Sequence, residues 1–172
     1  LISTISFLLF PVRQLQDQLA ASYRALGSFL FAKANVFDVD MTASSYQQSM
    51  IDVALENSKL ITLFNHLRIA LLTRLKGDRG QKDTRRSLHY YFVAQDIHER
   101  ADSAHIDYQK LAKLFQHSDI LFRFQRLLTL QGKACQDLAQ SILSQSPYVH
   151  HKRFKHSFEN LRLSLEKLRD DG

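Results

Sequence analysis

Leu1-Ile-Ser-Thr-Ile-Ser-Phe-Leu-Leu-Phe-Pro11 opens the chain, and the predicted fold depends on this stretch. It carries no charge, and the chain turns polar directly after it, at Val12-Arg-Gln-Leu-Gln-Asp-Gln18. A membrane crossing takes roughly 20 apolar residues, so the stretch has the length of the last turns of a transmembrane helix that ends at Pro11. It lacks the basic leading region and the small-residue cleavage site of a secretory signal. The alternative is a buried N-terminal helix of a soluble domain.

The composition of the 172-residue chain fits one globular domain with a full core. Five glycines and two prolines are few helix breakers, which favours an all-α fold. A single cysteine, Cys135, excludes an internal disulfide framework and suits a reducing compartment. The net charge of +6 fits nucleic acid, anionic lipid or solubility alone. The placement of the basic residues therefore has to decide between these partners.

Apolar residues recur at helical spacing in five segments, and no segment alternates with period two. We expect helices over about residues 11–36, 46–76, 84–104 and 108–144, and a fifth helix from about residue 151. The fourth is apolar on several faces, which is typical of a central helix. The sequence thus predicts an all-α antiparallel bundle of about five long helices, the first of which continues from a transmembrane segment. Residues 1–10 would end the transmembrane helix, and residues 11–172 would form a soluble helical domain.

Basic residues gather in the predicted loops on one side of this bundle. If the first helix leads away from the membrane, the second and fourth loops lie near the membrane and the other loops lie far from it. The far loops hold Asp38, Asp40 and Asp107 and no lysine or arginine. This distribution matches the positive-inside pattern and predicts a cytoplasmic domain at an anionic membrane surface. One missed helix would exchange the two ends. The predicted membrane-facing residues are Arg74, Lys76, Arg79, Lys82, Arg85, Arg86, Lys152, Arg153 and Lys155.

The third predicted helix carries the densest group of polar side chains. His98, Asp102 and His105 are spaced by four and three residues, so they could offer three metal ligands on one face. A di-iron bundle takes two Glu-x-x-His motifs and two further glutamates, and this segment offers one Asp-x-x-His. We therefore favour a structural network in which Asp96 or Glu99, beside Arg100, pairs with Arg123 or Arg126 of the fourth helix. No bound metal or other cofactor is expected.

Other candidate chemistry is weak. His117-Ser-Asp119 holds the residue types of a catalytic triad, but consecutive helical residues point about 100° apart and cannot form a relay, so a kink or a polar contact is favoured. Gly77-Asp-Arg-Gly-Gln81 lacks the phosphate-loop pattern and follows a helix, which favours a membrane-facing turn. Cys135 lies in an apolar stripe and is expected to be a packed thiol. No helix-turn-helix or zinc spacing points to nucleic acid, and no enzymatic activity is predicted.

Several motifs give the chain a family resemblance. The likeness covers nearly the whole chain, from Leu9 to Gly172, and the long block in the third predicted helix makes it specific. The chain resembles the YccS family of Gram-negative inner-membrane proteins, which is related to the fusaric-acid-resistance (FUSC) family. The motifs are Phe10-Pro-Val-Arg13 with Leu15-Gln-Asp17, Lys33 to Asp38, Leu71-Leu-Thr-Arg-Leu-Lys-Gly-Asp-Arg-Gly-Gln81, His89-Tyr-Tyr-Phe-Val-Ala-Gln-Asp-Ile-His-Glu-Arg-Ala101 and His117-Ser-Asp-Ile-Leu-Phe-Arg-Phe-Gln-Arg126.

The resemblance implies two membrane halves, each followed by a soluble helical region, with this chain as the first such region. It implies an efflux transporter of small molecules, with aromatic acids as a candidate class, and it carries over no catalytic or ligand residue. The implied partners are the remaining transmembrane part of the same protein, the anionic membrane surface and further copies of the chain. Two alternatives stay open: a structural or oligomerisation module, and a regulatory domain that binds a small anion or a metal at the third helix.

Overall fold

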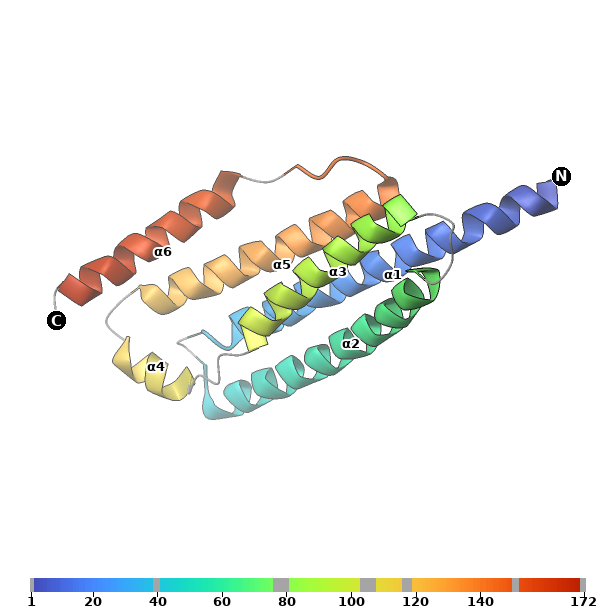
Figure 1. Ribbon diagram of the computed structural model, residues 1–172. Coiled ribbons are helices and arrows are strands. Elements are labelled where there is room, and N and C mark those ends of the chain that lie inside the picture. Colours follow the sequence, from blue (N-terminus) through green and yellow to red (C-terminus); the bar gives the residue numbers. More distant parts are fainter. Residues whose placement is uncertain are drawn as a thin grey trace.

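Helices make up the ordered framework of the protein. The computed structural model describes residues 2–38, 41–75, 81–102, 108–115, 119–149 and 152–170. Within these ranges the chain forms no strand, and the predicted all-α bundle with five long helices is confirmed (Figure 1). The helices are α1 (Ile2–Asn35), α2 (Ala43–Leu75), α3 (Gln81–Asp102), the short α4 (Tyr108–Leu114), α5 (Ile120–Ser144) and α6 (Lys152–Asp170).

The central helix is α1, which packs against α2, α3 and α5. Buried residues follow one another directly, as at Ser22 and Tyr23 or at Phe29 and Leu30, and a helix buries neighbouring positions only when partners cover several of its faces. The expectation that the fourth predicted helix is central was wrong. Its main part, α5, packs against α1 and α6 and leaves Phe122 exposed.

Pro11 lies inside α1 and does not divide it. The predicted helix boundary at this residue was therefore wrong. A proline removes one backbone hydrogen bond and crowds the carbonyl four residues earlier, and the intact turns on both sides allow the helix to continue. In the described part of the chain, no helix has both the length and the apolar character that a membrane crossing takes.

The segment predicted as one helix over residues 108–144 forms two helices, α4 and α5. Asp119 stands at the N-cap position of α5, and its carboxylate accepts a hydrogen bond of 2.8 Å from the Arg123 side chain. Asp119 makes no side-chain capping bond to the backbone, so its pairing with Arg123 one turn along is the contact seen at this helix start. The polar group predicted as a kink therefore marks the start of a new helix at Asp119, while His117 and Ser118 lie outside the described residues.

Two glycines allow α1 and α5 to approach each other closely. A Cβ atom built at Gly27 would lie 2.7 Å from the backbone oxygen of Gly132, and one built at Gly132 would lie 2.9 Å from the backbone oxygen of Gly27. Real Cβ contacts are longer, so the helix axes could not keep this separation with any larger residue. α6 adds a further layer on α5, with Ser157 and Leu161 buried.

The connections between helices sort into two ends of the bundle. Figure 1 shows that the α2–α3 connection and the end of α5 lie at the end from which the first turns of α1 extend, here called the N-terminal end. The end of α1, the end of α3 and the whole of α4 lie at the opposite end. The extra helix does not exchange the ends, because α5 runs back along the bundle as the undivided helix was expected to do.

Candidate functional site

A groove lies at the N-terminal end, where α3 and α5 diverge over α1. Its volume is about 480 Å³. Leu15 and Leu19 of α1 line it together with Leu138 and Ile142 of α5, so this part of the lining is apolar. Tyr148, in the connection after α5, is a further lining residue. The groove combines this apolar lining with charged side chains from two helices.

Charged residues of the groove come from α2 and α3. Arg74 is in the last turn of α2, and Asp83 and Arg86 are in the first turns of α3. Arg86 Nη2 lies 3.5 Å from Asp83 Oδ1, and both side chains are largely exposed, at 71% and 65%. An exposed pair of this kind contributes about 0–1 kcal/mol. An anionic ligand could therefore replace the carboxylate at Arg86 at little cost.

A hydrogen bond from Tyr23 fixes the position of α3 where it lines the groove. The Tyr23 hydroxyl of α1 donates a hydrogen bond of 2.7 Å to the backbone carbonyl of Tyr90, which lines the groove. The two rings also meet edge to face, 6.5 Å between centroids. Burial raises the pKa of Tyr23 above its usual value, so the hydroxyl keeps its proton and remains a donor. The shape of the groove is thus fixed by the core.

The predicted membrane-facing residues fall into three groups. Arg74 and Arg86 line the groove, and Lys82 and Arg85 are exposed nearby at the start of α3. Lys76 and Arg79 lie outside the described residues. Figure 1 shows α6 beginning part-way along α5, so Lys152, Arg153 and Lys155 are set back from the N-terminal end.

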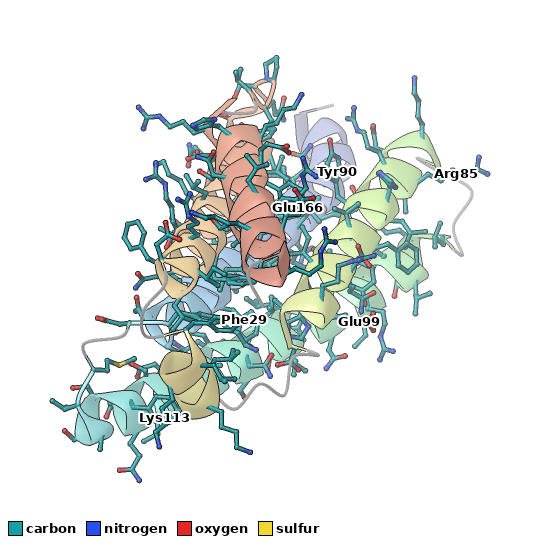
Figure 2. All side chains as sticks on the ribbon, turned by 90° about the vertical axis from the view of Figure 1, so that its left-hand side faces the viewer. Phe29, Arg85, Tyr90, Glu99, Lys113 and Glu166 are labelled. Carbon is teal, nitrogen blue, oxygen red and sulfur yellow. The ribbon has the colours of Figure 1, made fainter. Side chains whose placement is uncertain are left out.

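The opposite end is less acidic than the sequence indicated. The prediction counted loop residues only, whereas Lys110 and Lys113 belong to α4, which lies at this end, where Figure 2 shows Lys113. Asp38 is the described member of the predicted acidic group, while Asp40 and Asp107 lie outside the described residues. The contrast between the two ends therefore rests on the basic residues at the start of α3 and the end of α2.

A second polar group lies toward the opposite end, inside the bundle. Lys33 of α1 is buried, and its Nζ donates a hydrogen bond of 2.7 Å to the backbone carbonyl of Ala101 in the last turn of α3. The ammonium also lies 5.6 Å from the centre of the Phe29 ring. Burial lowers the pKa of Lys33, and Asp102 opposes that shift. A cation at a helix C-terminus stabilises the free carbonyls there, so Lys33 fastens α3 to α1.

His98 serves as a packing residue between three helices. Its Nε2 lies 2.6 Å from Asn57 Oδ1 of α2, and its ring meets Phe29 of α1 and Phe64 of α2 edge to face. No three His, Cys, Asp or Glu side chains of the described residues form a metal-binding group. His105 lies outside those residues, so the disfavoured candidate set of His98, Asp102 and His105 is not tested.

His98 is expected to make folding stability depend on pH. Burial lowers its pKa, with Asp102 and Glu99 opposing and Lys33 adding to the shift. Between the lowered and the ordinary pKa values, the unfolded state binds a proton at His98 and the folded state does not. The free energy of unfolding therefore falls as pH drops below about 6.5. His98→Gln should flatten the dependence of unfolding free energy on pH between about 7.5 and 5.5. Urea unfolding at several pH values measures this dependence, and the exposed His66→Gln variant is the control. The same pH dependence in His98→Gln as in the native chain would contradict the prediction.

The predicted network between helices was wrong in its pairing. Asp96 Oδ2 accepts a hydrogen bond of 2.9 Å from Arg100 Nε one turn along α3, and Arg123 pairs with Asp119 within α5. Among the described residues, no ion pair joins Asp96 or Glu99 to Arg123 or Arg126. The reason is geometric: α3 packs on α1 and α2, whereas α5 packs on α1 and α6. Figure 2 shows Glu99 on the outer side of α3 and Phe29 in the interior.

Cys135 is the packed thiol that the sequence predicts. It is buried in the core. Burial raises the pKa of the thiol to about 12. A thiol in this environment is almost wholly protonated at neutral pH and makes a poor nucleophile.

Comparison with known proteins gives the chain a family. The sequence profile of the FUSC-like inner membrane protein yccS matches residues 1–172. The chain belongs to this YccS family. It is 52% identical over 171 residues to the inner membrane protein YccS of Escherichia coli strain K12, a match that covers 99% of this chain and 24% of that relative. An uncharacterized protein of Haemophilus influenzae strain Rd is 38% identical over 168 residues, 94% of this chain and 23% of that relative.

The YccS relatives are about four times as long as the part that this chain matches. The chain thus corresponds to one portion of a bacterial inner-membrane protein. No solved structure matches it significantly.

Three residues of functional interest were missed in the sequence. Lys33 extends the stripe of Leu26 and Leu30 by one more helical step, and this spacing is the signal that could have shown its burial. Gly27 and Gly132 lie inside long helices, where a glycine costs about 1 kcal/mol relative to alanine. A glycine inside a helix lets a second backbone approach closely, but the sequence could not show which helix each one meets.

Proposed function

We propose that the chain forms the cytoplasmic helical domain of a multi-pass inner-membrane protein that exports small molecules, and that the domain catalyses no reaction. The position of Arg74, Lys82, Arg85 and Arg86 carries this proposal. They lie at the end of the bundle from which the first turns of α1 extend. Basic residues beside a membrane segment favour the cytoplasmic side, and family membership supplies the inner membrane.

Reporter fusions to the full-length protein test the topology. A reporter active only in the cytoplasm and one active only in the periplasm are each placed after Gly172. We expect signal from the cytoplasmic reporter. Signal from the periplasmic reporter alone would refute the cytoplasmic assignment.

The helix α1 gives the domain a mechanical role in the proposed export. It runs from Ile2 to Asn35 without interruption and contacts three other long helices. A displacement of a membrane segment joined to its first turns would therefore move α2, α3 and α5 together. The export itself is tested with labelled aromatic acids in cells that contain or lack the full-length protein. Lower accumulation in cells with the protein supports efflux, and equal accumulation contradicts it for that class.

A second candidate function, an association module, is favoured by the outer face of α2. Large apolar side chains are exposed at Ile51, Leu55, Ile69 and Leu72. With Ser58, Thr62 and Asn65, which are also exposed, they form a stripe spaced by alternating fours and threes and free of charged residues. This spacing is the seam of a two-stranded coiled coil. Two copies in one membrane relate by an axis along the membrane normal, so their α2 helices would pair in parallel.

Cysteine crosslinking tests this pairing in membranes. Thr62→Cys in the full-length protein should form a disulfide-linked dimer, because Thr62 lies at the middle of the stripe. Arg126→Cys, at an exposed position on α5, is the matched control and should stay monomeric. Equal crosslinking at both positions, or none at residue 62, would reject the module.

A further inference from the structure

The groove at the N-terminal end has an apolar part and a charged part. These match the first acyl carbons and the charged headgroup of a phospholipid. Its floor is apolar, from Leu15, Leu19, Leu138 and Ile142. Its rim holds two arginines, Arg74 and Arg86, against one carboxylate, Asp83. The lining also includes several residues that carry hydroxyl groups: Ser87, Tyr90, Ser141, Ser146 and Tyr148. Such a lining suits a ligand with a negative charge, several hydroxyl or ester oxygens and an apolar part.

The charge balance of the rim favours a phosphate ester. Arg74 and Arg86 come from two different helices, and Asp83 engages Arg86 only through the exposed contact at 3.5 Å. Arginine donates several N–H groups in a fixed fork that fits phosphate oxygens. The start of α3 adds the partial positive charge of a helix N-terminus on the same side. Among the described residues of the rim, arginines thus outnumber carboxylates.

The distance from the proposed membrane boundary favours a lipid over a free solute. Leu15 lies four residues after Pro11, which is about 6 Å along a helix at a rise of about 1.5 Å per residue. The headgroup layer on each side of a bilayer is about 5–7 Å thick. If the apolar segment before Pro11 crosses the membrane, the groove opens at headgroup depth. This step rests on the proposed function.

We propose that the groove binds an anionic phospholipid headgroup from the facing leaflet. The phosphate lies at Arg74 and Arg86, and the glycerol and the first acyl carbons cover Leu15, Leu19, Leu138 and Ile142. The bound lipid joins α2, α3 and α5 to the membrane surface beside α1.

A photoreactive lipid tests the site in the full-length protein. The protein is reconstituted in phosphatidylcholine nanodiscs that contain a little phosphatidylglycerol with a diazirine near the start of one acyl chain. We expect labelling of peptides that contain residues 83–90 and 138–148. Arg74→Gln with Arg86→Gln should lower this labelling on the order of tenfold, because two charged contacts are lost. Lys110→Gln with Lys113→Gln, at the opposite end, removes the same charge and should leave it unchanged.

Further variants and probes distinguish a bound lipid from a soluble phosphate ester and from a misfolded groove. Arg74→Lys with Arg86→Lys keeps the charge but loses the arginine fork, so its labelling should lie between those of the native protein and the glutamine variant. That result would show that the glutamine variant acts through charge rather than misfolding. Equal labelling by a phosphatidylcholine probe, or no loss in the glutamine variant, would overturn the proposal. Competition by soluble glycerol 3-phosphate would also overturn it, since the ligand would then be a free phosphate ester.

The lipid site and the topology can fail separately. Absence of labelling in the native protein together with cytoplasmic reporter signal would refute the lipid site alone. Labelling of the groove peptides together with periplasmic reporter signal would refute only the topology.

Discussion

Gly27→Leu is expected to force α1 away from α5 and to abolish the native packing of the bundle. Even alanine at this position should destabilise the fold by about 1–3 kcal/mol, the usual cost of overpacking. Its Cβ would lie 2.7 Å from the backbone oxygen of Gly132 and 2.8 Å from Gln136 Cγ. The glutamine side chain can turn aside, but the backbone oxygen moves only with α5. Chemical denaturation followed by far-ultraviolet circular dichroism measures both variants.

The sign of the alanine effect makes this prediction specific. In a helix interior with free space, Gly→Ala raises stability by about 1 kcal/mol through helix propensity. Lys133→Ala, on the exposed position beside Gly132, is the control and should change stability by less than about 0.5 kcal/mol. A Gly27→Ala variant as stable as the native chain would show that the two helices do not meet at these glycines.

Leu67→Ala should lower the free energy of unfolding by about 2–5 kcal/mol, as large-to-small changes in a core do. The Leu67 side chain is fully buried, at 0% exposure, between α2 and the rest of the core. Leu55→Ala removes the same atoms from the same helix, but Leu55 is 54% exposed. Its effect on stability should stay below about 0.5 kcal/mol. Denaturation of the two variants compares the inner and outer faces of α2 directly.

The same pair of variants also bears on association. If α2 pairs with a second copy, Leu55→Ala should weaken the crosslink at residue 62 in membranes while leaving the folded chain intact. Equal losses of stability from Leu55→Ala and Leu67→Ala would mean that the outer face is packed within one chain. That result would remove the reason to expect a partner on α2.

Periodicity was sufficient for most of the framework. The stripe of Leu15, Leu19, Tyr23, Leu26 and Leu30 is buried as its spacing predicts. The run of Leu60, Phe64, Leu67 and Leu71 likewise forms the inner face of α2. These patterns are local, because one helix face needs only residues three and four apart. The identity of the central helix depends on contacts between residues distant in sequence. α1 is central because α2, α3 and α5 all pack against it.

The candidate site was less predictable than the fold. The basic character of Arg74 and Arg86 was visible in the sequence, but the groove between them and the apolar floor was not. It arises because α3 and α5 diverge above α1, which no spacing within one segment records. The pairing of Asp96 failed for a similar reason: Arg100, one turn away, was closer than any arginine of α5.

The unbroken course of α1 through Pro11 has a consequence for its angular phase. In a continuous helix, each residue advances the side chains by about 100° and about 1.5 Å. One residue inserted between Pro11 and Leu15 would therefore turn everything before it by more than a quarter of a revolution relative to the bundle. Seven inserted residues would nearly restore the original azimuth while lengthening the helix by about 10 Å. A function that tolerates the longer insertion but not the shorter one would depend on the rotational setting of α1 rather than on its reach.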